Sequence, residues 1–244
     1  MRGMIDIHCH LLPKVDDGAR SMKEALRMLQ IEEADGVSAV IITPHFRAGM
    51  FETPEAKIEG TFIKLQEEAL KTGLKIRIFP GCEYHASSGM VDDFLNGRRL
   101  TLAGSWYVLA EFSGADRYSV ITQRISELIS AGFHPVIAHA ERIECLRREY
   151  GRFQELIRMG AEIQITAGTL LGEDGWSIGH ICRKMIKDGS VRYIASDAHR
   201  VRERRPNLRE CFDFLVKKYG QETAEELLIV NPRKILSKDN KFYG

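Results

Sequence analysis

The 244-residue sequence has no long hydrophobic segment. No apolar run approaches the roughly 20 residues that a membrane-spanning helix needs. The opening MRGMIDIH has no apolar stretch of the signal-peptide type. We therefore expect no membrane span and a soluble, cytoplasmic protein.

Cysteine is scarce, and its spacing excludes several site types. The five cysteines are odd in number and contain no Cys-x-x-Cys pair, which argues against a disulfide framework or a zinc ribbon. None has an arginine six positions later, so a cysteine-based phosphatase loop is excluded.

An excess of one charge is also missing, because 35 Lys and Arg face 34 Asp and Glu, for a formal charge of +1. Without a global field, we expect no nucleic-acid partner. The one local excess is at residues 200–209, which hold five arginines. This segment is either a solvated loop and helix start or an anion clamp, since guanidinium groups match phosphate oxygens.

The rest of the chain alternates between strand-like and helical patterns. Strands are predicted at residues 4–8, 38–43, 75–80, 106–112, 135–139, 162–166 and 191–196. Helices are predicted at 21–35, 54–72, 117–131, 150–159, 177–188, 207–219 and briefly after 221. Ser21 with Glu24 forms a capping box, and glycines follow five of the helices. The rhythm predicts one α/β domain over residues 1–244, built on a parallel sheet.

Residues of the types that commonly bind metals stand at the ends of six of the seven predicted strands. They are His8, His10, His45, Glu83, Glu111, His139, Asp197 and His199. They can meet only if the strands share one open end, which favours a closed barrel over an open sheet. The ligands are too many for one cation, so we expect two or three, and imidazole with carboxylate suits Mn, Fe or Zn.

Each of these residues also has a plainer explanation. A lone histidine such as His45 is more often structural, whereas a carboxylate closing an apolar run is costly to bury unless it is paired or bound to a metal. Asp17 lies in a turn-forming Asp-Asp-Gly run and is either a turn residue, a ligand, or an acid or base. His85 is equally open. We expect His134 and His180 to be structural.

Arginine cannot bind a metal, so beside cations it would hold a phosphate or stabilise transition-state charge. Arg142 follows His139 by three residues and is the main candidate for this role. Arg47 follows His45 by two residues, and it reaches either an anion or solvent.

Several of these motifs together resemble the polymerase and histidinol phosphatase (PHP) superfamily. They are His8-Cys-His-Leu-Leu-Pro, Thr43-Pro-His, Pro80-Gly-Cys-Glu, Ala138-His-Ala-Glu-Arg and Ser196-Asp-Ala-His. Within it, Asp16-Asp-Gly, the His-Ala-Glu-Arg turn, Gly168-Thr-Leu-Leu-Gly and Asn231-Pro-Arg-Lys-Ile-Leu resemble the manganese-dependent bacterial protein tyrosine phosphatases of the CpsB/CapC type. The likeness spans about residues 4 to 236.

This resemblance implies a distorted seven-stranded (β/α)7 barrel with a trinuclear, usually manganese, centre. It also implies phosphotyrosine substrates on tyrosine kinases that control capsule or exopolysaccharide synthesis. The eight strand-end residues would be the ligands, Arg142 would assist catalysis, and Asp17 is a further catalytic candidate. The family has an arginine-proline after the Asp-x-His motif, and this sequence has an extra arginine there, so Arg204 and Arg205 both remain candidates for binding the substrate. Cys82 stands where the family leads us to expect a polar residue.

The expected activity is hydrolysis of phosphotyrosine by a metal-bound hydroxide, without a phosphoenzyme. The alternatives are another PHP phosphoesterase, such as a histidinol-phosphate phosphatase, and a TatD-like metal nuclease. A non-catalytic metal-bound scaffold is the alternative from a different class. The sequence predicts no particular oligomeric state.

Overall fold

The computed structural model describes residues 3–237, so residues 1–2 and 238–244 of the expected domain lie outside the described part. Its strands pair in parallel within two sheets. The smaller sheet has the order β1 (Met4–Cys9), β2 (Val37–Ile42), β4 (Arg77–Pro80). The larger one has the order β3 (His45–Phe46), β5 (Glu83–His85), β6 (Tyr107–Glu111), β7 (His134–Ile137), β8 (Glu162–Thr166), β9 (Tyr193–Ala195). The predicted parallel α/β architecture is confirmed.

The chain passes from the smaller sheet to the larger one twice, each time at a short interruption. Thr43-Pro44 separates β2 from β3, and Gly81-Cys82 separates β4 from β5. Gly81 fits tightly there, because a Cβ atom at this position would lie 2.9 Å from Cγ2 of Ile41. The sequence did not predict β3 and β5, because two or three residues are too few to show an alternating pattern.

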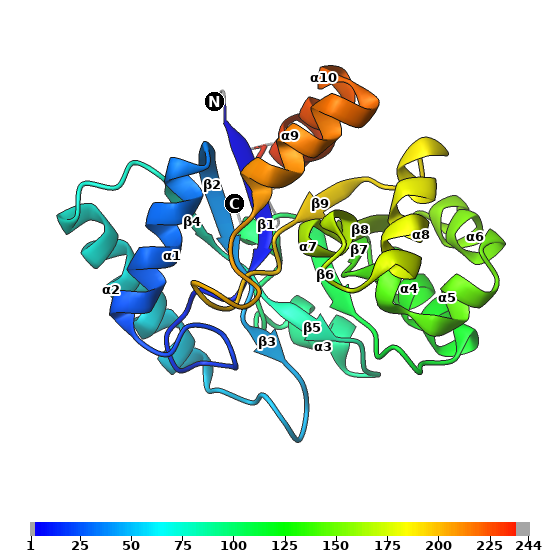
Figure 1. Cartoon of the computed structure of the whole chain (residues 1–244). Coiled ribbons are helices and arrows are strands. Elements are labelled where there is room, and N and C mark those ends of the chain that lie inside the picture. The colour runs from blue at the N-terminus through cyan, green and yellow to red at the C-terminus, as the bar shows by residue number, and fades with distance from the viewer. Residues whose placement is uncertain (1–2, 238–244) are drawn as a thin grey trace.

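The larger helices cover the strands from outside (Figure 1). They are α1 (Met22–Ala34), α2 (Glu55–Lys71), α4 (Tyr118–Ser130), α6 (Gly151–Met159), α8 (Trp176–Lys187) and α9 (Leu208–Tyr219). All six lie within a residue or two of their predicted bounds. The chain continues through α10 (Gln221–Glu225), a π-helical turn (Glu226–Val230) and α11 (Asn231–Ile235).

Three short helices and two 3₁₀ turns were not predicted. They are α3 (Met90–Leu95), α5 (Glu144–Arg148), α7 (Ala167–Leu171), η1 (Leu102–Gly104) and η2 (Ala140–Arg142). Each is too short to show a helical period in the sequence. Two of them, η2 and α7, directly follow strand ends and shape the site described below.

The predicted start of α1 is largely confirmed. The Ser21 hydroxyl accepts a hydrogen bond from the Glu24 backbone N–H at 3.2 Å. The Glu24 carboxylate accepts from the N–H of Arg20, one residue earlier than a standard capping box. Gly36, which follows this helix, has a φ of 88°, a conformation that favours glycine.

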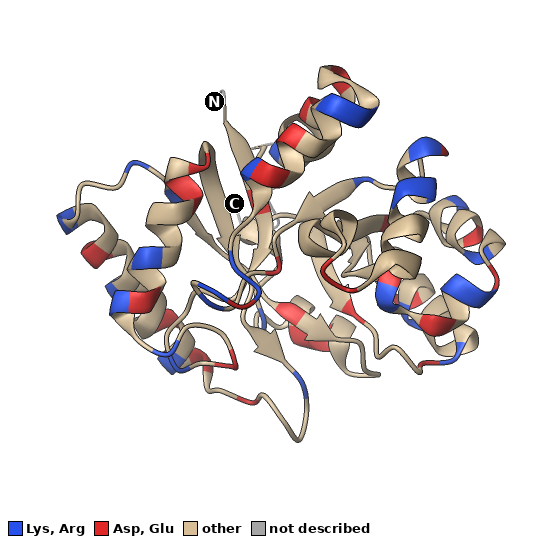
Figure 2. Cartoon of the chain, in the orientation of Figure 1, with Lys and Arg blue, Asp and Glu red and all other residues tan. Residues whose placement is uncertain are grey.

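The apolar core has two parts. The larger lies where the helices pack on the strands, and a smaller cluster joins alternate residues of several strands, including Ile5, Ile7, Leu109, Val136 and Ala195. Basic and acidic residues are interspersed along the covering helices (Figure 2). No helix within residues 3–237 is both long and apolar enough to cross a membrane.

Candidate metal centre

The residues predicted at the strand ends meet in one buried cluster. Nε2 of His8 and Nε2 of His10 are 3.1 Å apart. The Glu83 Oε2 atom lies 3.2 and 3.3 Å from these two nitrogens, and Asp197 Oδ1 lies 3.5 Å from each. His8, His10 and Asp197 therefore form one group of converging donor atoms, all buried.

Glu83 connects this group to a second one. Its Oε2 atom lies 2.8 Å from Nδ1 of His45, and its Oε1 atom lies 2.9 Å from Nε2 of His139. Glu111 faces the same two rings, at 4.0 Å from His45 Nδ1 and 3.8 Å from His139 Nε2. His45, Glu83 and Glu111 form the second group that could hold a cation.

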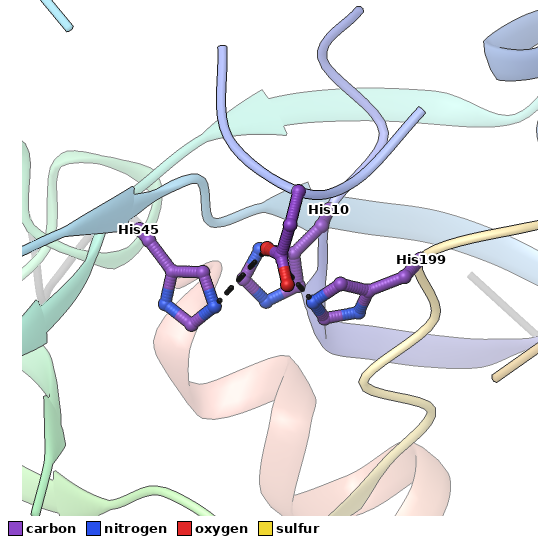
Figure 3. Close-up of side chains that lie close together, drawn as sticks. His10, His45 and His199 are labelled. Carbon is purple, nitrogen blue, oxygen red and sulfur yellow. Dashed lines mark ion pairs between the residues drawn. The ribbon is translucent and has the colours of Figure 1, made fainter. Parts of the chain in front are cut away.

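A third group surrounds Asp17, whose role the sequence left open. Its Oδ1 atom lies 3.4 Å from Nε2 of His199 and 3.6 Å from Nε2 of His45. Figure 3 shows the rings of His45 and His199 on either side of His10. The His10 and His199 ring centroids are 4.0 Å apart. His10, Asp17, His45 and His199 together offer four converging donor atoms.

The buried atoms of the cluster test whether a cation fits. Glu83 Oε2, Asp197 Oδ1 and His199 Nε2 are buried without a hydrogen-bond partner among the described residues. Buried polar atoms are nearly always paired, since leaving one unpaired is costly. Here the unpaired atoms lie among the other nitrogen and oxygen atoms of the cluster. Oxygen and nitrogen donors in this arrangement suit divalent cations.

Three of the imidazoles are held by hydrogen bonds on the side away from the cluster. The His8 Nδ1 atom lies 3.1 Å from Oε1 of Gln164, and His10 Nδ1 lies 2.8 Å from Oδ2 of Asp16. His199 Nδ1 lies 2.9 Å from the Asp197 carbonyl oxygen. An Nδ1–H that donates to these oxygens leaves each Nε2 lone pair directed into the cluster, as metal-binding histidines require.

Asp16 and Gln164 were missed by the sequence analysis. The Gln164 amide oxygen also accepts the His139 backbone N–H at 3.0 Å, so this strand positions two candidate ligands although it supplies none. The Asp16 carboxylate also accepts the N–H of His45 at 3.0 Å and that of Gly18 at 2.9 Å. The Asp-Asp-Gly run was the only signal for Asp16 in the sequence, and it was used for Asp17 alone.

The backbone is unusual at two of the candidate ligands. His139 has a φ of 31° and Asp197 a φ of 53°, both in the left-handed region that non-glycine residues rarely adopt. Each residue follows the last residues of a strand, β7 or β9, so the turn redirects its side chain. Strained residues of this kind often mark functional sites.

The charges of the cluster change several pKa values. Burial would raise the pKa of the Glu83 carboxyl, but the neighbouring imidazoles, His8 first, hold it well below its usual range. Burial would also raise the pKa of the Asp197 carboxyl, but His8 and His10, together with Arg204 and Arg142, lower it well below its usual range. Burial and the nearby His10 lower the pKa of His199 to about 4. His199 is therefore neutral at physiological pH, as a ligand must be.

Two arginines border the cluster at Asp197. Nη1 of Arg142 lies 2.8 Å and Nη2 of Arg204 lies 2.7 Å from the Asp197 Oδ2 atom, so both occupy the oxygen that faces away from His8. Arg205 instead pairs with Glu210 at 2.7 Å. A cavity of about 260 Å³ lies beside these arginines, and Asp197 forms part of its wall.

The remaining candidates lie outside the three groups. The Arg47 backbone pairs with that of Phe51, and the Phe51 ring stacks on His45 at 5.0 Å between centroids. Nε2 of His85 lies 2.9 Å from the Ser113 hydroxyl. The two histidines expected to be structural stack on aromatic rings, His134 on Tyr107 and His180 on Trp176.

The sequence matches a family of bacterial proteins over residues 4–237, under the description "Capsular polysaccharide synthesis, CpsB/CapC". The tyrosine-protein phosphatase CpsB of Streptococcus pneumoniae is 35% identical over 238 residues, which are 96% of this chain and 98% of that protein. The tyrosine-protein phosphatase YwqE of Bacillus subtilis is 31% identical, over 90% of this chain and 86% of its own.

Solved structures agree with these matches. One chain from the crystal structures of YwqE from Bacillus subtilis and CpsB from Streptococcus pneumoniae, described as metal-dependent tyrosine phosphatases, has a TM-score of 0.89 and 30% sequence identity to this chain. The match covers 99% of this chain and 96% of that one. The architecture of the strands and helices is therefore shared across the whole chain.

Proposed function

This chain belongs to the CpsB/CapC family, and we propose that it is a metal-dependent phosphatase that hydrolyses phosphotyrosine in proteins. One observation supports this most directly. Eight strand-end side chains converge in a largely buried cluster, and two arginines meet at its edge on Asp197. A phosphate ester is the substrate that needs both kinds of group.

The proposed ligands are those of the sequence analysis with Asp17 added. They are His8, His10, Asp17, His45, Glu83, Glu111, His139, Asp197 and His199. Three groups of converging donors support two or three ions, with manganese as the expected metal and iron or zinc as alternatives. The contacts of Asp17 with His199 and His45 favour a ligand over a free acid or base.

Cations held by these residues would lower the pKa of bound water and would neutralise charge on phosphate oxygens. The protein's own part is to fix the ligands and to hold the phosphate. Arg142 and Arg204 both reach Asp197, so each can donate to a phosphate that lies against the cluster. Arg205 is paired with Glu210, which favours Arg204 as the phosphate arginine. Arg47, beside Phe51, would contact the substrate protein.

We also propose that the two sheets make up one distorted seven-stranded barrel within a single domain. The side at which this barrel would close lies between β1 and the end of β9. There the backbone N–H of His10 donates to the Ala198 carbonyl at 2.8 Å, and that of Asp197 donates to His8 at 2.9 Å. Closure at this point accounts for the position of His8 and His10 beside Asp197.

The proposed substrate is a phosphorylated tyrosine kinase that regulates capsule or exopolysaccharide synthesis, and the proposed location of this phosphatase is the cytoplasm. The family's description, capsular polysaccharide synthesis, supports this pathway. The names of the relatives support tyrosine as the phosphorylated residue.

The test is hydrolysis of a phosphotyrosine peptide after chelation and after Mn²⁺ is added back. We expect activity to disappear with chelator, to return with Mn²⁺, and to be lost in His139→Ala and Asp197→Ala. Activity that survives either treatment would contradict the mechanism. Faster turnover of histidinol phosphate or single-stranded DNA would favour another phosphoesterase or a nuclease, and bound metal without any turnover would favour a scaffold.

A further inference from the structure

The motif Gly168-Thr-Leu-Leu-Gly172 and the loop after it lie next to Arg142, and the proposed function gives them no role. The motif forms α7 and its C-terminal turn, directly after β8. Thr169 is buried, although it carries a hydroxyl group. A buried polar side chain in this position needs a partner.

That partner is Asp174. The Thr169 hydroxyl donates to Oδ2 of Asp174 at 2.5 Å, and the same oxygen accepts from Nε of Arg142 at 3.2 Å. Arg142 also donates through Nη1 to Asp197 at 2.8 Å. The guanidinium is therefore held at two of its three nitrogens by two carboxylates, and Nη2 has no hydrogen-bond partner among the described side chains.

The loop that carries Asp174 is itself fixed. The Gly168 carbonyl accepts the N–H of Gly172 at 3.0 Å and that of Glu173 at 2.9 Å. Gly172 and Gly175, on either side of the acidic pair, have φ values of 106° and 90°, which favour glycine. The backbone thus sets the position of the Asp174 carboxylate, and the Thr169 hydroxyl sets its orientation.

We propose that Asp174 is a positioning residue that orients Arg142 toward the substrate phosphate, an inference that rests on the proposed function. Asp197 alone would leave the guanidinium free to rotate about its one contact, since Arg142 is about one-third exposed. Asp174 fixes the plane of the group before phosphate arrives, so less conformational freedom is lost on binding. The plain alternative is a half-exposed ion pair with no effect on function, as many surface pairs are.

The test compares Asp174→Asn with Glu173→Gln in the full-length, Mn²⁺-loaded protein. Glu173 is the matched control, because it is adjacent and loses the same charge but contacts Asn207 rather than Arg142. We expect Asp174→Asn to lower kcat/KM on a phosphotyrosine peptide by about 10-fold, given the cost of misplacing a catalytic group. Glu173→Gln should stay within about twofold, as surface changes usually do. Thr169→Val should shift activity in the same direction as Asp174→Asn, but less. Bound Mn²⁺ should be equal in all variants.

A double-mutant cycle separates positioning from a general structural effect. If Asp174 acts through Arg142, Asp174→Asn should have no further effect in an Arg142→Ala background. Additive losses, equal losses in Glu173→Gln, or full activity in Asp174→Asn would each overturn the proposal.

The dissociation constant of inorganic phosphate, measured by calorimetry on the Mn²⁺-loaded protein, gives a second readout that needs no turnover. Asp174→Asn should weaken phosphate binding, and Glu173→Gln should not. A wild-type protein that binds phosphate but does not hydrolyse phosphotyrosine would refute the proposed function alone. Unchanged phosphate binding in Asp174→Asn would refute the role of Asp174 alone.

Discussion

Replacing Asp16 with asparagine should weaken cation binding although no proposed ligand is changed. The Asp16 carboxylate accepts three hydrogen bonds, from His10 Nδ1 at 2.8 Å, from the His45 N–H at 3.0 Å and from the Gly18 N–H at 2.9 Å. Asparagine has the same shape but only one oxygen. Whichever way its amide turns, it cannot accept all three.

The loss reaches His10 through charge. Oδ2 of Asp16 accepts from both His10 and His45, and Oδ1 accepts from Gly18, so the asparagine oxygen best takes the Oδ2 position and turns its NH₂ group against the Gly18 N–H. The oxygen that then faces His10 is neutral, whereas a carboxylate partner raises the basicity of an imidazole that binds a metal. Loss of such a carboxylate partner costs about 10- to 100-fold in metal affinity. This corresponds to about 1.4 to 2.8 kcal/mol.

The assay is a titration with Mn²⁺, in which binding is measured by calorimetry and phosphatase activity is measured at each Mn²⁺ concentration. We expect Asp16→Asn to need about 10- to 100-fold more Mn²⁺ and to recover activity when Mn²⁺ is raised. Asp213→Asn on α9 is the control, because it removes the same charge from an exposed pair with Arg209. Unchanged affinity in Asp16→Asn would refute the view that the charge of this carboxylate strengthens His10 as a ligand.

Arg204→Ala should lower kcat/KM by about 10- to 100-fold, the value of a charge-assisted hydrogen bond, while Arg205→Ala stays within about twofold. Steady-state kinetics on one peptide decides between them, and equal losses would contradict the assignment. Gln164→Leu should lower the amount of bound Mn²⁺, because His8 Nδ1 loses its partner at 3.1 Å. Full Mn²⁺ loading of this variant, measured by elemental analysis, would contradict this prediction. His199 has a pKa of about 4, so between about pH 4 and its unfolded value near 6.5 the unfolded chain binds more protons, and stability of the chelated protein rises with pH. Melting curves of His199→Asn should lack this part of the pH dependence.

The strand ends were predictable because each carried its own signal. A charged or imidazole side chain after an apolar run is visible in the sequence, and parallel strands must end at one edge. This reasoning predicted that His45, Glu83 and Glu111 converge, as they do in the structure, without any knowledge of distances. It also gave the larger helices to within a residue or two, since their length shows a clear period.

Residues that act by orienting others carry no such signal. Gln164 lies within a strand and resembles any polar residue there, and its role depends on His8, 156 positions earlier in the chain. Asp16 stands in a turn-forming run, so turn chemistry explained it fully. Asp174 follows a helix too short to be predicted. Each of these roles depends on tertiary contacts, which one sequence cannot give.

The alternation of β1 shows how local irregularity makes the cluster possible. Ile5 and Ile7 belong to the smaller apolar cluster, so regular alternation would place Cys9 on that face and turn His8 and His10 toward the helices. In the structure, Asp6 pairs with Val40 but Cys9 pairs with Ile42, so three steps on β1 match two on β2. This bulge moves both imidazoles to the inner face and sends Cys9 into the outer core. The left-handed turn at His139 has the same consequence on β7, because Val136 and Ala138 already occupy the inner positions. The two imidazoles of the sequence motif His-x-His therefore converge in the cluster only because the strand that carries them is irregular.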